Sequence, residues 1–204
     1  MSNNSTQQHT FANPGPSALI GLVMACFCLF AINTGKVEGT AAPVLACWMV
    51  GGGLLQYAAG LMELRNGDQK GGNTFFVFGA FLMFANALSL MTKYLLAQHG
   101  MPFDARIEGW AWLGITSCII LWTPAFLRKS NAILCTMVVV LDVTLILISL
   151  VDMAVIDKAT YGPISGWALL IIGILGIYLT GAITVNEAFD RAVLPIPGPV
   201  LKDK

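Results

Sequence analysis

Residues 133–155 read ILCTMVVVLDVTLILISLVDMAV, an apolar run in which Asp142 and Asp152 are the only charged side chains. As a helix that rises about 1.5 Å per residue, this run is long enough to cross a hydrocarbon layer of about 30 Å. Five other stretches of the chain are also apolar, and the six are each about 18 to 25 residues long. The six runs are Ser17–Thr34, Ala41–Met62, Asn73–Ala97, Gly109–Leu127, Ile133–Val155 and Gly162–Val185.

The composition of the whole chain agrees with these runs. Of the 204 residues, 56% are hydrophobic and 11% are charged, whereas soluble domains contain about 25% charged residues. The runs are apolar on nearly all sides, as expected for helices surrounded by lipid or by other helices. The sequence therefore predicts an all-α membrane protein with six transmembrane helices. We expect an N-terminal tail over residues 1–16, a six-helix domain over 17–187 and a C-terminal tail over 188–204.

Little of the chain is left for other kinds of function. No stretch outside the six runs is long enough for a soluble catalytic or nucleotide-binding domain, and a net charge of zero gives no basic surface for nucleic acid. All five cysteines fall inside the predicted helices, while His9 and His99 fall outside them. We therefore predict no enzyme activity, no metal site and no cofactor.

An even number of helices places both termini on one side of the membrane. The side that holds the termini is predicted to carry seven basic residues and the opposite side four, which places both termini in the cytoplasm by the positive-inside rule. The protein is then expected in the cell inner (plasma) membrane. The seven are Arg65, Lys70, Arg128, Lys129, Arg191, Lys202 and Lys204, and the four are Lys36, Lys93, Arg106 and Lys158.

Polar side chains recur at helical spacing within the runs. Because polar groups are costly in lipid, such side chains face protein or water. We interpret them as the lining of a narrow path, with hydrogen bonding between neighbouring helices as the alternative. They are Asn33, Gln56, Glu63, Asn86, Thr144 and Thr180. Asp142, deep in the fifth run, is either a proton carrier or a structural partner at a helix interface.

Three short motifs go beyond composition. Asn13–Leu19 reads NPGPSAL, Gly60–Asn66 reads GLMELRN shortly before GNTF at Gly72–Phe75, and Asn186–Ile196 reads NEAFDRAVLPI. In order and position these motifs resemble those of the acetate uptake transporter (succinate–acetate permease) family. The resemblance covers essentially the whole chain.

The resemblance implies a membrane permease or channel for acetate and related short-chain carboxylates such as succinate, linked to protons and assembled as a homo-hexamer. It also implies an entrance formed by the Asn-Pro-x-Pro motif, in which two prolines fix the backbone before the first helix. The positions assigned to the entrance and path are Asn13, Pro14, Pro16, Asn73 and Thr74. Asp142 and Glu63 are the candidates for proton-linked groups.

The resemblance further implies an apolar constriction formed by Leu22, Met83 and Leu141. Members of the family usually have Phe, Tyr and Leu at these positions, so this chain differs at two of the three. A channel for small neutral solutes such as urea or short amides is the alternative function, because those channels are also six-helix protomers in hexameric rings.

Overall fold

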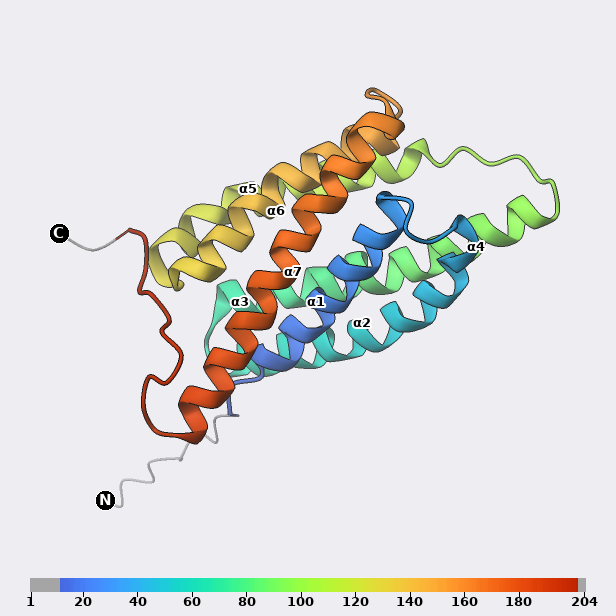
Figure 1. Ribbon diagram of the computed structural model, residues 1–204. Coiled ribbons are helices and arrows are strands. Elements are labelled where there is room, and N and C mark those ends of the chain that lie inside the picture. Colours follow the sequence, from blue (N-terminus) through green and yellow to red (C-terminus); the bar gives the residue numbers. More distant parts are fainter. Residues whose placement is uncertain (1–11, 202–204) are drawn as a thin grey trace, which may run out of the picture.

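In the computed structural model, which describes residues 12–201, the chain forms helices joined by short loops, with no strand in that range (Figure 1). The elements are α1 (Gly15–Asn33), the 3₁₀ helix η1 (Gly39–Ala41), α2 (Ala42–Arg65), α3 (Gln69–Val77), the π-helix η2 (Phe78–Ala85), α4 (Asn86–Gln98), α5 (Arg106–Lys129), α6 (Ala132–Asp152) and α7 (Lys158–Ala188). Six segments are long and apolar enough to span a membrane, and α3, η2 and α4 together form the third. The predicted fold class is confirmed: this is an all-α, multi-pass membrane protein with six spans.

Local capping sets where three of the helices begin. The side chains of Asp68, Asn131 and Asp157 accept hydrogen bonds from first-turn amides of α3, α6 and α7, at 3.2, 2.9 and 2.8 Å. Between α2 and α3 the chain turns at Gly67, whose φ of +86° lies in the left-handed region that favours glycine. Because the helices begin and end at these defined residues, the loops between the spans are short.

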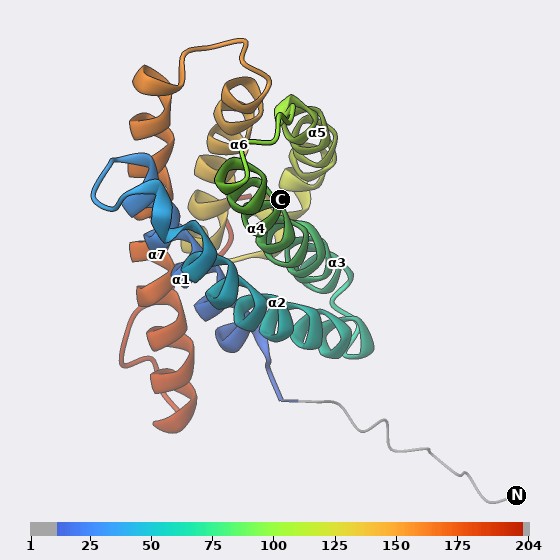
Figure 2. The ribbon, with the colours of Figure 1, turned by 90° about the vertical axis from the view of Figure 1, so that its right-hand side faces the viewer.

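The spans surround a common axis. Helix α1 packs along α7 and α2, α6 lies between α5 and α7, and the third span packs on α2 (Figure 2). Close approach of α2 and α3 depends on Gly72, where a Cβ atom would lie 2.8 Å from the backbone nitrogen of Leu64. Contact between the third span and α5 is sparse, so this seam is the loosest side of the bundle.

The segment after α7 folds back across the end of the bundle (Figure 1). Asn186 fixes its start: the Nδ2 donates to the Leu194 carbonyl at 2.7 Å, and the Oδ1 accepts from the amides of Val193 and Leu194, both at 2.8 Å. Further along, the Leu201 amide donates to the Leu127 carbonyl at 2.9 Å. The segment therefore ties the end of α7 to the end of α5.

Helical spacing in the sequence also suggests that Glu187 and Arg191 pair where α7 leaves the membrane. That expectation is wrong, because α7 ends at Ala188 and Asp190 has a φ of 50°, which breaks the i, i+4 geometry. No ion pair joins the two side chains among the described residues.

Candidate functional site

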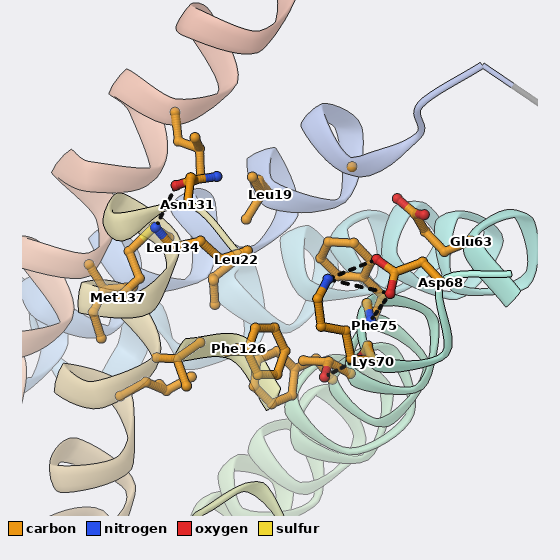
Figure 3. Close-up of a pocket in the computed structure, with 18 of the residues that line it drawn as sticks. Leu19, Leu22, Glu63, Asp68, Lys70, Phe75, Phe126, Asn131, Leu134 and Met137 are labelled. Carbon is orange, nitrogen blue, oxygen red and sulfur yellow. Dashed lines mark hydrogen bonds and ion pairs between the residues drawn. The ribbon is translucent and has the colours of Figure 1, made fainter. Parts of the chain in front are cut away.

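A cavity of about 170 Å³ opens at the end of the bundle where α1 begins and α7 ends, and we name it the tail-side cavity (Figure 3). Its deep walls are apolar and include Leu22, Phe78 and Leu141. Polar groups gather nearer the chain ends, where Asn13 and Glu63 also line it. The cavity is therefore an apolar well with a polar rim.

An ion pair lies on that rim. The Lys70 Nζ is 3.0 Å from the Asp68 Oδ2, and the same ammonium lies 5.6 Å from the centre of the Phe126 ring (Figure 3). On the first helix, the Gly15 amide donates to the Asn13 Oδ1 at 2.8 Å. A positive charge is thus held beside the mouth of an apolar cavity.

A second cavity, of about 160 Å³, opens at the opposite end of the bundle, and we name it the far-side cavity. It is lined by more polar groups, which come from the five helices α1, α4, α5, α6 and α7. In this cavity the Lys93 Nζ lies 2.6 Å from the Glu108 Oε2, and the Asn33 Nδ2 donates to the Ser165 Oγ at 3.5 Å. The further polar and charged residues of its lining are Asn86, Asp152 and Lys158.

The two cavities share five spans, namely α1, the third span, α5, α6 and α7, and α2 adds Glu63 to the tail-side cavity. On each span, the residues that line one cavity give way to residues that line the other. On the third span Phe78 lines the tail-side cavity and Leu82 the far-side cavity, and on α6 the corresponding residues are Leu141 and Leu145. A four-residue step along a helix is about 6 Å. On α1 the nearest lining residues, Leu22 and Leu29, are seven residues apart, or about two turns. A buried layer roughly one to two helical turns thick therefore separates the cavities.

The sequence profile of the GPR1/FUN34/yaaH family matches residues 2–197. The chain belongs to this family. The Succinate-acetate/proton symporter SatP of Escherichia coli (strain K12) is 32% identical over 187 residues, which are 91% of this chain and 95% of that protein. A solved structure of the bacterial acetate channel SatP superposes with a TM-score of 0.76 at 28% identity and covers 92% of this chain and 99% of that one.

A more distant relative in the comparison is Ammonia transport outward protein 2 of Saccharomyces cerevisiae (strain ATCC 204508 / S288c). It is 28% identical over 155 residues, which cover 71% of this chain and 52% of the yeast protein. The resemblance that the three sequence motifs indicate is confirmed by these matches. The family consists of transporters and channels rather than enzymes, as we expected for this chain.

In this GPR1/FUN34/yaaH family member, several predicted path residues do lie on the cavities. Leu22, Leu141, Asn13, Glu63 and Thr74 line the tail-side cavity. Asn33 and Asn86 line the far-side cavity. Pro14 is the N-cap residue of α1 and Pro16 lies in its first turn, so the two prolines set how the first helix begins beside Asn13.

Met83 lies outside both cavities, so its part in the predicted constriction stays a prediction. Met83 is fully buried but lines neither cavity, and it packs against Gly52 and Gly53 of α2. Met83 is part of the π-helix η2, whose turns are wider than those of a regular α-helix. The apolar residues that the third span contributes at the layer are Phe78 and Leu82.

Gln56 also lines neither cavity. Of the residues that line the two cavities, Glu63 is the one from α2, because the buried face of α2 packs on α1 and the third span. The Gln56 Nε2 donates to the Ala18 carbonyl at 3.5 Å, and its side chain is fully buried between α1 and α2. Gln56 therefore joins two helices, the alternative that we left open for polar residues in spans.

Four other predicted residues bond within the bundle or lie outside the cavities. Thr144 and Thr180 donate to carbonyls of their own helices at 2.7 and 3.0 Å, and neither lines a cavity. Asn73 donates to the Gln69 carbonyl at 2.7 Å and faces a groove between α3 and α5. The Asp142 Oδ2 accepts a hydrogen bond of 2.6 Å from the Thr123 hydroxyl, so this carboxyl group joins α6 to α5.

Sequence reasoning missed the ion pair on each cavity. Lys70 and Asp68 are two residues apart, but Lys93 and Glu108 are separated by a loop, and nothing in their spacing indicates that they meet. It also missed Thr116 of α5, whose buried hydroxyl has no hydrogen-bond partner in the described structure. A signal was present for Glu108, because a carboxylate near the end of a predicted span requires a partner.

Proposed function

We propose that this family member is a membrane permease for acetate and related short-chain carboxylates, succinate included, and that the solute passes between the two cavities. The observation that carries the proposal is the pair of cavities, which share five spans and face opposite ends of the bundle. The named transport functions of the relatives that cover nearly the whole chain supply the substrate class.

The apolar layer favours passage of a carboxylic acid together with a proton. A carboxylate loses most of its hydration at a narrow apolar neck, whereas the neutral acid does so at a much smaller cost. Leu22 and Leu141 lie on the tail-side edge of this layer. Of the two carboxyl groups proposed as proton-linked, Glu63 has access to a cavity, while Asp142 is bonded to Thr123.

We also propose six copies in a ring in the inner membrane, with both termini in the cytoplasm. Large apolar side chains cover the outer face of α2, among them Val44, Trp48 and Leu54, which are 62%, 63% and 62% exposed in one protomer. Such a surface requires lipid or a second protomer against it. Native mass spectrometry from a mild detergent tests this arrangement: we expect a hexamer, and a monomer that retains transport in liposomes contradicts it.

Uptake of labelled acetate by the purified protein in proteoliposomes tests the function. We expect uptake above that of empty liposomes, with a rise as the external pH falls from about 8 to about 5, because more of the acid is then neutral. Propionate and succinate should compete with acetate. Uptake that is flat over this pH range contradicts proton-linked passage, and rapid swelling in urea without acetate uptake supports the neutral-solute channel instead.

A further inference from the structure

We propose that Lys93 is a carboxylate-binding group of the far-side cavity, and that Glu108 occupies this group until the carboxylate of a substrate displaces it. The inference rests on the proposed function, since it identifies where a short-chain carboxylate binds before it reaches the apolar layer. Lys93 and Glu108 are neither part of the three motifs nor among the path residues predicted from the sequence.

The first observation is the position of the lysine. Lys93 lines the far-side cavity, as does Asn86, about two turns nearer the apolar layer on the same helix. Ser89 lies between them, so the three polar side chains follow one face of α4 at steps of three and four residues. A carboxylate bound at Lys93 therefore has an amide donor ahead of it on the way to Leu82.

The second observation is how Glu108 is held. One carboxylate oxygen, Oε2, lies 2.6 Å from the Lys93 Nζ, and the other, Oε1, accepts a hydrogen bond from the Ser89 hydroxyl. The glutamate keeps the bond from Ser89 when the lysine is taken by another carboxylate. The Lys93 side chain is 30% and the Glu108 side chain 23% exposed, so water still reaches both.

The energetics of exchange favour such a site. A lysine at a partly buried position binds a carboxylate strongly but pays a large desolvation cost if it is left alone. Replacement of one carboxylate by another keeps the ammonium paired throughout, and the displaced Glu108 carboxylate keeps its hydrogen bond from Ser89 and its contact with water. A resident carboxylate also keeps the affinity for substrate moderate, which permits the substrate to leave toward the layer.

The charges around the pair define the class of ligand. Asp152 of α6 and Lys158 of α7 also line the cavity, and Asp152 lies near enough to interact electrostatically with Glu108, Lys93 and Lys158. Lys93 and Lys158 both offset the charge of Asp152, and Lys93 is also in direct contact with Glu108, so it is the cation at which one carboxylate can replace another. A small monocarboxylate fits this arrangement better than a dicarboxylate, because a second carboxylate would approach Asp152.

Two substitutions with opposite expected effects test the exchange. Lys93→Met should raise the half-saturating acetate concentration about tenfold, the effect of losing one charge-assisted hydrogen bond. Glu108→Gln should lower it severalfold, because the competing carboxylate is gone while Ser89 still holds the side chain. The measurement is acetate uptake into proteoliposomes in which the C-terminus is protected inside, so that substrate arrives from the Lys93 side. Lys36→Met is the matched control, since Lys36 is an exposed lysine on the same side of the bundle and lines neither cavity.

The double variant Lys93→Met, Glu108→Gln separates exchange from a structural ion pair. Exchange predicts that the double variant binds acetate as weakly as Lys93→Met alone. A structural pair predicts that both single variants lose thermal stability and that the double variant recovers it, because no unpaired charge remains. The proposal is overturned if the two single variants shift the half-saturating acetate concentration in the same direction.

An NMR titration with ¹³C-acetate keeps this test independent of transport. The detergent-solubilised protein is titrated in a Lys70→Met background, which removes the ammonium on the rim of the tail-side cavity. Opposite shifts of the dissociation constant in the Lys93 and Glu108 variants support the exchange site even if the wild-type protein transports no acetate, in which case the proposed function alone fails. A dissociation constant that both substitutions leave unchanged overturns the exchange site.

Discussion

The tail-side and far-side cavities share five spans but differ in the chemistry of their walls. The tail-side cavity is an apolar well with its ion pair, Lys70 and Asp68, at the rim. On the opposite side, Lys93 and Glu108 line the cavity together with Asn33 and Asn86. The far-side cavity is thus suited to a hydrated, charged carboxylate, and the tail-side cavity to an acid that has lost its charge or is about to regain it.

This difference has a physical origin in the helices. Spans that begin or end near one side of a membrane place charged residues there without crossing the hydrocarbon layer. In the far-side cavity five helix ends meet, and each contributes a polar group to a shared space. On the tail side, the segment after α7 and the α5–α6 turn cover part of the bundle end, so the walls are built from the apolar interiors of the spans. We expect the two cavities to respond differently to substitution.

The largest expected effect comes from closing the layer between the cavities. Leu82→Trp places a large ring at the far-side edge of the layer and should reduce acetate uptake to background while the protein stays folded. Leu88→Trp, at a position of the same span that is 71% exposed, is the matched control and should transport normally. Retained uptake in the Leu82 variant would remove Leu82 from the path.

Met83→Trp distinguishes the neighbouring position. Met83 packs against Gly52 and Gly53 instead of a cavity, so a larger side chain there should push α2 away from the third span and lower thermal stability. Purified Met83→Trp protein that is as stable as wild type yet blocked in transport would restore Met83 to the constriction. Uptake per folded molecule and melting temperature, measured on the same sample, decide between these outcomes.

The next largest effect is expected from widening the layer. Leu141→Ala removes a buried side chain, 4% exposed, from the tail-side edge of the layer. Uptake of butyrate relative to acetate should rise severalfold, because a wider neck lowers the dehydration cost for larger acids. If stability falls by about 2–5 kcal/mol, as is usual for such a truncation, and the preference among acids is unaltered, Leu141 packs in the core without lining the path.

A smaller effect is expected at the segment that covers the tail side. Asn186→Ala removes three hydrogen bonds to the backbone of Val193 and Leu194 and should lower the melting temperature by several degrees, at about 1 kcal/mol per bond. Tyr178→Phe removes a single bond, to the Pro195 carbonyl at 2.8 Å, and should have a smaller effect. An unchanged melting temperature in both variants would show that the segment does not stabilise the bundle.

The sequence predicts the spans well but not which faces meet. Six apolar runs and three motifs suffice for the fold class and the family, because hydrocarbon thickness and helix rise leave few alternatives. The π-helix in the third span could not be predicted, since it changes the angle per residue in a way that apolar residues do not reveal. The pairing of Lys93 with Glu108 depends on how two spans separated by a loop are placed side by side, which helical spacing within one span does not contain.

The smallest expected effect contrasts the helix caps at the two ends of the bundle. On the far side α7 is capped by Asp157, and on the tail side α6 is capped by Asn131, which does not titrate. Hydrogen bonds from Thr160 hold the pKa of the Asp157 carboxyl below its ordinary value. A carboxyl whose pKa is lowered by folding stabilises the folded state above its unfolded pKa of about 3.9, and this contribution is lost as the pH falls through the lower folded value.

Asp157→Asn keeps an amide oxygen as cap acceptor but removes the titration, so its melting temperature should change less than that of wild type on acidification below about pH 4. Asn131→Asp should introduce the same acid sensitivity at the tail side. Melting curves of the two variants and the wild type between about pH 3 and about pH 7 measure the contrast, and identical acid profiles for all three would show that cap charge contributes nothing at either end.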